Sequence, residues 1–201
     1  MGPTHVLQAL ADDPALAGVP IGLVGTFVGG TYIEQWIRQE QQASCTETLC
    51  GSSDLERFKC GSLYNGHIAP FVNSTITGMI WYQGENNVRN VAGSVANKTG
   101  YACQMASMIS DWRAIWSAVP GTTAALFPFG VTQLAGSCSE GFPANTGAFR
   151  RSQTGGYGAL PNEAMPNTFL GQAYGNFDII FGHFSRTSQL HATPHAPCNM
   201  S

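Results

Sequence analysis

The sequence predicts an α/β protein with a parallel sheet covered by helices, and two observations carry this prediction. Short, continuous apolar runs end in glycine, as at 19–30 and 77–84, which is how strands buried on both faces of a parallel sheet are composed. Stretches with apolar residues at three- and four-residue spacing alternate with these runs and indicate amphipathic helices. Strands that alternate with helices are typical of α/β folds, and 201 residues suffice for one domain with a core.

The first predicted unit is a buried strand at 19–30, a turn at Gly29 and Gly30, and a helix at 31–39. Helical spacing of three apolar residues supports the last element: Ile33, Trp36 and Ile37. In α/β sheets the ligand lies beyond the carboxyl ends of the strands, so this turn is a candidate site.

The alternation continues along the chain. A short helix is predicted at 62–72, a second buried strand at 77–84, and further strands at 123–135 and, less regularly, at 167–182. The clearest helix is at 101–119. Its apolar residues form one stripe: Tyr101, Met105, Met108, Trp112, Ile115 and Trp116. We therefore expect Trp112 and Trp116 in the core.

Charge and motifs narrow the functional classes. Nine basic and twelve acidic residues give a net charge of −3 without clusters, which argues against a nucleic-acid partner and against a polybasic membrane patch. No apolar run is long enough to span a bilayer. Zinc-type cysteine pairs, dinucleotide fingerprints and P-loops are missing from the sequence, so we expect no metal and no cofactor. The expected partner is small or neutral.

The cysteines and sequons favour a secretory route. Cys45, Cys50 and Cys60 fall in one loop-like stretch, where a local disulfide is expected. Asn73 and Asn97 head N-glycosylation sequons. Residues 1–18 do not form a signal peptide but have the spacing of an amphipathic helix, so we expect that an upstream segment has been lost.

Two loops have side chains or N–H groups suited to catalysis. The glycines at 29–30 allow a close backbone approach, and free N–H groups at a helix start suit a developing oxyanion. The segment WYQGENN (81–87) gathers amides and a carboxylate around one glycine, and such amides are neutral donors. The alternative for both loops is a turn without a ligand. Trp81 and Tyr82 fit either a sugar pocket or a buried strand end.

Several segments, taken in order, carry a resemblance to a known family: PIGLVGTFVGGTYIEQW, LYNGHIAPFVNSTITGMIWYQGENN, FPFGVTQL, GFP and PNEAMPNTF. The chain resembles the sialate O-acetylesterases of the SGNH-hydrolase superfamily. The resemblance implies an SGNH-hydrolase-like, flavodoxin-like parallel sheet flanked by helices, here expected to be incomplete. It also implies hydrolysis of O-acetyl esters on sialic acids or related glycans through an acyl-serine, without metal, in a lysosomal or secreted protein.

The resemblance assigns an oxyanion hole. Gly29 or Gly30 matches the family's oxyanion-hole glycine, and Gly84 opens its Gly-x-Asn pattern. Asn86 is then the implied side-chain donor, with Gln83 as the alternative donor.

The sequence departs from the family twice. The family's nucleophile lies in a Gly-Gln-Ser-Asn-like block, which these residues do not contain, and its base lies in a histidine block that is altered here. Asp178 and His183 are the candidate acid and base. We expect a partial SGNH esterase domain at 1–182 and a divergent, poorly ordered tail at 183–201. Two hypotheses stay open: an O-acetylesterase, or a catalytically inactive fragment or isoform with at most glycan binding.

Overall fold

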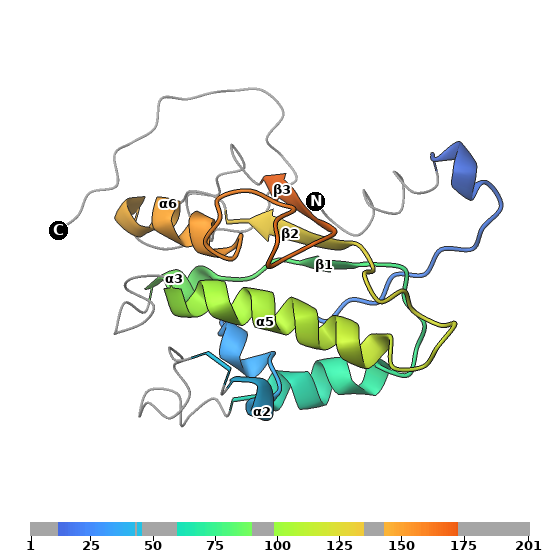
Figure 1. The fold of residues 1–201 in the computed structure, drawn as a ribbon, viewed down its shortest axis with the longest axis horizontal. Coiled ribbons are helices and arrows are strands. Elements are labelled where there is room, and N and C mark those ends of the chain that lie inside the picture. The colour runs from blue at the N-terminus through green and yellow to red at the C-terminus, as the bar shows by residue number, and fades with distance from the viewer. Residues whose placement is uncertain (1–11, 43, 46–59, 90–98, 135–142, 173–201) are drawn as a thin grey trace.

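The centre of the fold is a three-stranded parallel sheet in the order β1-β2-β3 (Figure 1). The computed structural model describes residues 12–42, 44–45, 60–89, 99–134 and 143–172. The strands are β1 (Met79–Trp81), β2 (Phe129–Gln133) and β3 (Thr168–Gln172). Each lies inside a predicted strand, so the predicted α/β class with a parallel sheet is confirmed.

The longest helix, α5 (Thr99–Trp116), covers one face of the sheet. Its Trp112 ring lies 5.6 Å from that of Trp81 in β1 and 6.3 Å from that of Phe129 in β2. The apolar stripe therefore packs on the strands, and the prediction of Trp112 and Trp116 as core residues is confirmed. On the other face of the sheet, Ile80 and Phe169 are about half exposed.

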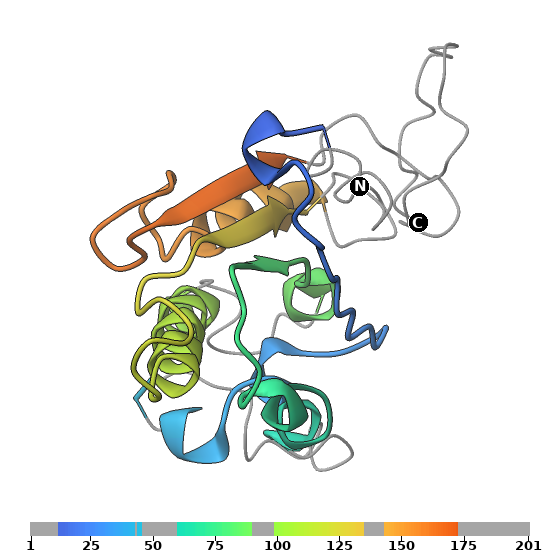
Figure 2. The same cartoon turned by 90° about the vertical axis from the view of Figure 1, so that its right-hand side faces the viewer.

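Shorter helices complete the described fold. In chain order they are η1 (Pro14–Leu16), η2 (Ile33–Gln35), α2 (Gln39–Gln42), the π-helix η3 (Tyr64–Ile68), η4 (Ala69–Phe71), α3 (Glu85–Arg89) and α6 (Pro143–Ser152). The helix predicted at 62–72 is confirmed by η3 and η4, which lie on the same side of the sheet as α5 (Figures 1 and 2). The helix predicted at 31–39 is a single 3-10 turn, although its apolar residues are buried as expected.

The strand predicted at 19–30 is wrong. These residues form no strand, and Val24 and Phe27 are 70% and 82% exposed. Figure 2 shows the segment as an unpaired trace at the side of the molecule. An apolar composition suits a buried strand, but a strand also needs a neighbour for its backbone hydrogen bonds, and no described strand pairs with these residues. Of the predicted N-terminal helix, 1–11 lie outside the described residues.

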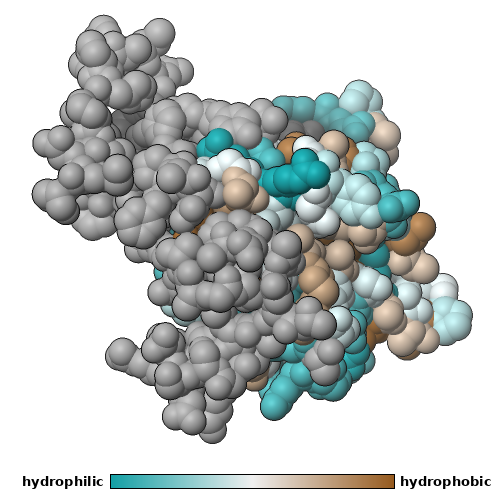
Figure 3. Space-filling model, turned by 60° about the vertical axis from the view of Figure 1, so that its left-hand side comes forward, coloured by the Kyte–Doolittle hydropathy of each residue, from teal (hydrophilic) through white to brown (hydrophobic). Residues whose placement is uncertain are grey.

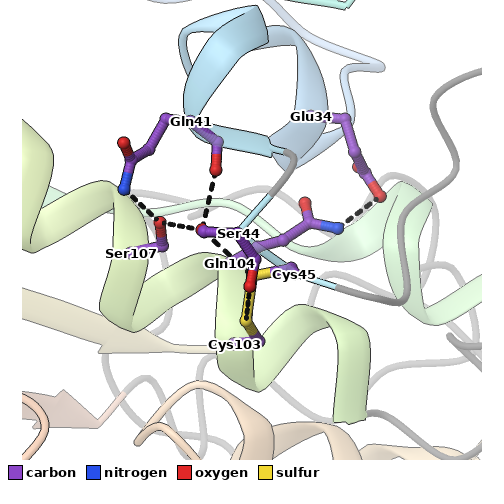
Figure 4. The surroundings of a disulfide bond; sticks show 7 residues. All are labelled: Glu34, Gln41, Ser44, Cys45, Cys103, Gln104 and Ser107. Carbon is purple, nitrogen blue, oxygen red and sulfur yellow. Dashed lines mark hydrogen bonds between the residues drawn. A yellow bond between two sulfur atoms is a disulfide. The ribbon is translucent and has the colours of Figure 1, made fainter.

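A disulfide joins distant parts of the chain. Cys45 is bonded to Cys103 of α5, at a sequence separation of 58 residues. Cys45 therefore takes no part in a local disulfide within 45–60; Ser44 and Cys45, which follow α2, lie against α5 (Figure 4). Cys60 is also disulfide-bonded. Cys50 lies outside the described residues.

Arg113 of α5 holds the starts of two strands together. Its guanidinium donates to the carbonyls of Phe127, Pro166 and Asn167, which precede β2 and β3. Burial lowers the pKa of Arg113, yet the carbonyl oxygens around it satisfy its donors. The strand starts are thereby fixed at one edge of the sheet, and the carboxyl ends emerge together at the other.

Candidate functional site

Two loops meet at the carboxyl ends of the strands. The glycine loop (residues 29–33) ends at the first residue of η2, and the amide loop (residues 83–87) runs from the end of β1 into the first turn of α3. The turn of the amide loop requires Gly84, whose φ is +142°. A Cβ at Gly84 would lie 2.4 Å from Cε1 of Phe149 in α6, so packing also excludes a side chain there.

Three buried hydrogen bonds connect the glycine loop and its continuation to the amide loop. The Ile33 N–H donates to Asn87 Oδ1 at 3.0 Å, and Gln83 Nε2 donates to the carbonyl of Thr31 at 2.9 Å. Asn87 Nδ2 donates to Glu34 Oε2 at 3.0 Å. These bonds join residues 31–34 to Gln83 and Asn87, which are about fifty residues away in sequence. They therefore determine how the two loops lie against each other.

Gln83 is held from several sides. Besides the Thr31 carbonyl, its Nε2 donates to Asn87 Oδ1 at 2.7 Å, and the Tyr101 hydroxyl donates to its Oε1 at 3.0 Å. Burial raises the pKa of Tyr101, which keeps the phenol a neutral donor. Both Gln83 amide protons have partners inside the protein, which argues against Gln83 as an oxyanion donor.

Gly30 and Asn86 lie on the outer side of the joined loops. Gly30 is exposed and Asn86 half-buried, and a Cβ built on Gly30 would lie 3.8 Å from Asn86 Nδ2. Gly30 has φ +72°, a conformation that glycine adopts without strain. Gly29 is exposed, with nothing within 4 Å of a built Cβ. The structure thus brings together Gly30 and Asn86, two residues that the sequence assigned to one site.

The described residues that are visible in Figure 3 form a surface of mixed character. Hydrophilic and hydrophobic residues alternate over short distances on this side of the molecule (Figure 3). Within the described ranges no group of three or more histidine, cysteine, aspartate or glutamate side chains could hold a metal ion.

Other predicted residues are distributed as follows. Asp178, His183 and Asn97 lie outside the described residues. Asn73 is exposed after η4. Trp81 is buried, its ring edge-on to Trp36 at 5.7 Å, which favours the strand-end interpretation over a sugar pocket.

Several buried polar residues surround the two loops, and the sequence offered little indication that they would lie there. Glu34, Tyr101, Gln104 and Gln153 are all buried around the loops. Gln153 Nε2 donates to the Thr132 carbonyl at 3.1 Å and its Oε1 accepts from the Leu134 N–H at 3.1 Å, so it secures the end of β2 beside the amide loop. A carboxylate inside the apolar stretch YIEQWI was the one signal for Glu34.

The parallel sheet flanked by helices defines an α/β protein, and comparisons with known proteins place it among the carbohydrate esterases. A family model described as "Carbohydrate esterase, sialic acid-specific acetylesterase" matches residues 6–126. The chain therefore belongs to the family of sialic acid-specific acetylesterases. The part of the chain that the structure describes contains no helix long and apolar enough to cross a membrane.

Individual relatives agree with this assignment. The chain is 35% identical over 164 residues to sialate O-acetylesterase of Homo sapiens and 32% identical over 190 residues to that of Mus musculus; each match covers 77% of this chain. It spans 29% and 33% of those relatives' lengths. A crystal structure of a carbohydrate acetylesterase from Xanthomonas citri is similar, with TM-score 0.63 and 28% identity, covering 89% of this chain and 35% of that one.

Proposed function

We propose that this chain supplies the oxyanion-stabilising side of a carbohydrate O-acetylesterase site. The reaction is hydrolysis of acetyl esters on hydroxyls of sialic acids or related glycans, through an acyl-serine intermediate. The observation that carries the proposal is the convergence of Gly30 and Asn86 at the carboxyl ends of the strands, with 3.8 Å between a Cβ position on Gly30 and Asn86 Nδ2. Family membership and the names of the relatives support the substrate class.

The proposed chemistry follows from charge development. When a nucleophile attacks the acetyl carbonyl, negative charge accumulates on its oxygen, and preorganised neutral N–H donors stabilise that charge. The Gly30 backbone N–H and the Asn86 side-chain amide are the donors we assign. Asp178 and His183 remain the proposed acid and base, and the serine belongs to a Gly-Gln-Ser-Asn-like block that these 201 residues do not contain.

A lysosomal or secreted location is proposed with this function. The Cys45–Cys103 disulfide and the exposed sequon residue Asn73 support passage through an oxidising, glycosylating compartment. The net charge of −3 supports a sugar substrate over nucleic acid.

The test uses the longest natural form of the protein that contains this sequence. Release of acetate from O-acetylated sialic acid is measured for the wild type, for Asn86→Ala and for the exposed control Asn65→Ala. Loss of one oxyanion donor is expected to lower kcat by about 10²–10³-fold with a small change in KM. A decrease under twofold, or an equal decrease in the control, contradicts the assignment of Asn86.

The 201-residue chain alone gives a second measurement. We expect no serine labelling by a fluorophosphonate probe and no hydrolysis of an acetyl-ester chromogen above a boiled control. Strong labelling would contradict the assignment of the nucleophile to a separate block. Binding of O-acetylated sialosides without acetate release by any form would support the glycan-binding alternative.

A further inference from the structure

Glu34 is a buried carboxylate to which the proposed reaction gives no direct part. It is 1% exposed. Its Oε2 accepts from Asn87 Nδ2 at 3.0 Å and its Oε1 from Gln104 Nε2 at 3.3 Å. Burial of a carboxylate costs free energy unless its oxygens accept hydrogen bonds, so these amide donors have to be directed towards it.

The position of Glu34 is fixed through its backbone as well. Its carbonyl accepts from the Gly61 N–H at 3.0 Å and from the Gln42 side-chain amide. The carboxylate therefore extends from an anchored backbone, in η2, directly after the glycine loop.

Glu34 determines which way the Asn87 amide faces. Asn87 Oδ1 already accepts from the Ile33 N–H and from Gln83, so its Nδ2 must find an acceptor on the opposite side. Glu34 is that acceptor. Exchange of the Asn87 oxygen and nitrogen would turn an N–H group towards two donors and an oxygen towards a carboxylate, which is unfavourable in a buried site.

Helix α5 contributes one of the hydrogen-bond donors to the Glu34 carboxylate. Gln104, which donates to Glu34, follows Cys103 in sequence, and the Cys45–Cys103 disulfide ties this turn of α5 to the stretch after α2 (Figure 4). A hydrogen bond from Gln41 Nε2 to Ser107 Oγ at 3.0 Å adds to the same contact.

We propose that Glu34 is a positioning residue that acts through Asn87. By fixing the Asn87 amide it holds the glycine loop against the amide loop, and thereby keeps Gly30 beside the Asn86 side chain. The catalytic consequence of this placement rests on the proposed function, whereas the placement of Gly30 beside Asn86 does not. Glu34 is not a catalytic residue, because its carboxylate faces the interior of the protein.

The experiment reverses one hydrogen bond. Asn87→Asp puts a second carboxylate about 3 Å from Glu34, and two charges at that distance repel strongly in a buried site. Glu34→Gln combined with Asn87→Asp keeps the total charge and both shapes: the new amide at position 34 donates to the new carboxylate at position 87. Its oxygen still accepts from Gln104, and the Ile33 N–H still meets an acceptor.

The primary readout is the ¹H–¹⁵N spectrum of the 201-residue chain. Asn87→Asp is expected to shift the Gly30 backbone signal and the Asn86 side-chain signals, and the double variant to return them to their wild-type positions. The matched control is Glu40→Gln combined with Asn65→Asp, the same two exchanges at exposed positions, which should leave those signals in place. Unmoved signals in Asn87→Asp, or no recovery in the double variant, overturn the proposal.

A second variant covers the case in which Asn87→Asp does not fold. Glu34→Gln alone removes the charge with little change of size, so displaced Gly30 and Asn86 signals in it support the proposal and unmoved signals overturn it. In the longest natural form, Asn87→Asp is expected to lower kcat about 10–100-fold, as small misplacements of catalytic groups do, with KM changed less than about threefold and recovery in the double variant. Absence of acetate release by the wild type would reject the proposed function, while the spectra still decide the role of Glu34.

Discussion

Two apolar stretches of similar composition adopt different structures in this protein: one is a buried strand and the other is an exposed segment that pairs with no described strand. Residues 19–28 and β2 both consist mainly of apolar residues and glycine. In β2, Phe129 and Val131 are 0% and 1% exposed, whereas Phe27 is largely exposed and its ring lies back over Gly25. Only one of the two stretches became a strand.

The difference lies in the neighbours rather than in the residues. Strand β2 pairs with β1 on one side and β3 on the other, and α5 covers its buried face. No described strand pairs with 19–28. Buried backbone groups need hydrogen-bond partners, so an apolar run without an adjacent strand stays in contact with solvent.

The largest effect is expected from a substitution in the buried strand β2. Phe129→Ala should lower the free energy of unfolding by about 3–5 kcal/mol, because a fully buried aromatic side chain is removed and a cavity remains. Phe27→Ala should change it by less than about 0.5 kcal/mol, as expected for an exposed side chain. Urea unfolding followed by tryptophan fluorescence measures both. Equal costs would mean that 19–28 is packed as tightly as β2.

The second-largest effect is expected from the Cys45–Cys103 disulfide, which anchors the segment after α2 to α5. Replacement of both Cys45 and Cys103 by serine should lower the free energy of unfolding by about 2–4 kcal/mol, since the cross-link closes a long loop between the segment after α2 and α5. The urea midpoint of the double variant is compared with that of Ser44→Ala in the same stretch. A midpoint unchanged from the wild type would show that packing alone anchors this segment to α5.

The smallest effects concern the glycines at the two loops. Gly84→Ala should cost about 1–3 kcal/mol, because its Cβ would collide with Phe149 and its φ is +142°. Gly29→Ala should cost less than about 1 kcal/mol, since a Cβ there meets nothing within 4 Å. Thermal unfolding of the two variants side by side gives the ranking. The reverse order would contradict the packing of the amide loop against α6.

Part of the candidate site could be predicted from the sequence. Gly30 and Asn86 were assigned to one site by their place at strand ends and by resemblance, and the structure brings them together. The role of Glu34 was not accessible, because a carboxylate in a helical stripe looks the same whether it faces solvent or two buried amides. The same holds for Gln83, whose hydrogen bonds with Thr31 and Tyr101 depend on long-range contacts.

Local pattern was sufficient where one element's own periodicity decides the outcome. The helix α5 and the strand β1 could be predicted without knowing what they pack against, because the spacing of their apolar residues indicates which face is buried. Tertiary structure alone decided that 19–28 is not a strand, that Cys45 pairs with Cys103, and that Glu34 orients Asn87. Each of these depends on which residues distant in sequence lie adjacent in space, and hydrophobic periodicity carries no information about that adjacency.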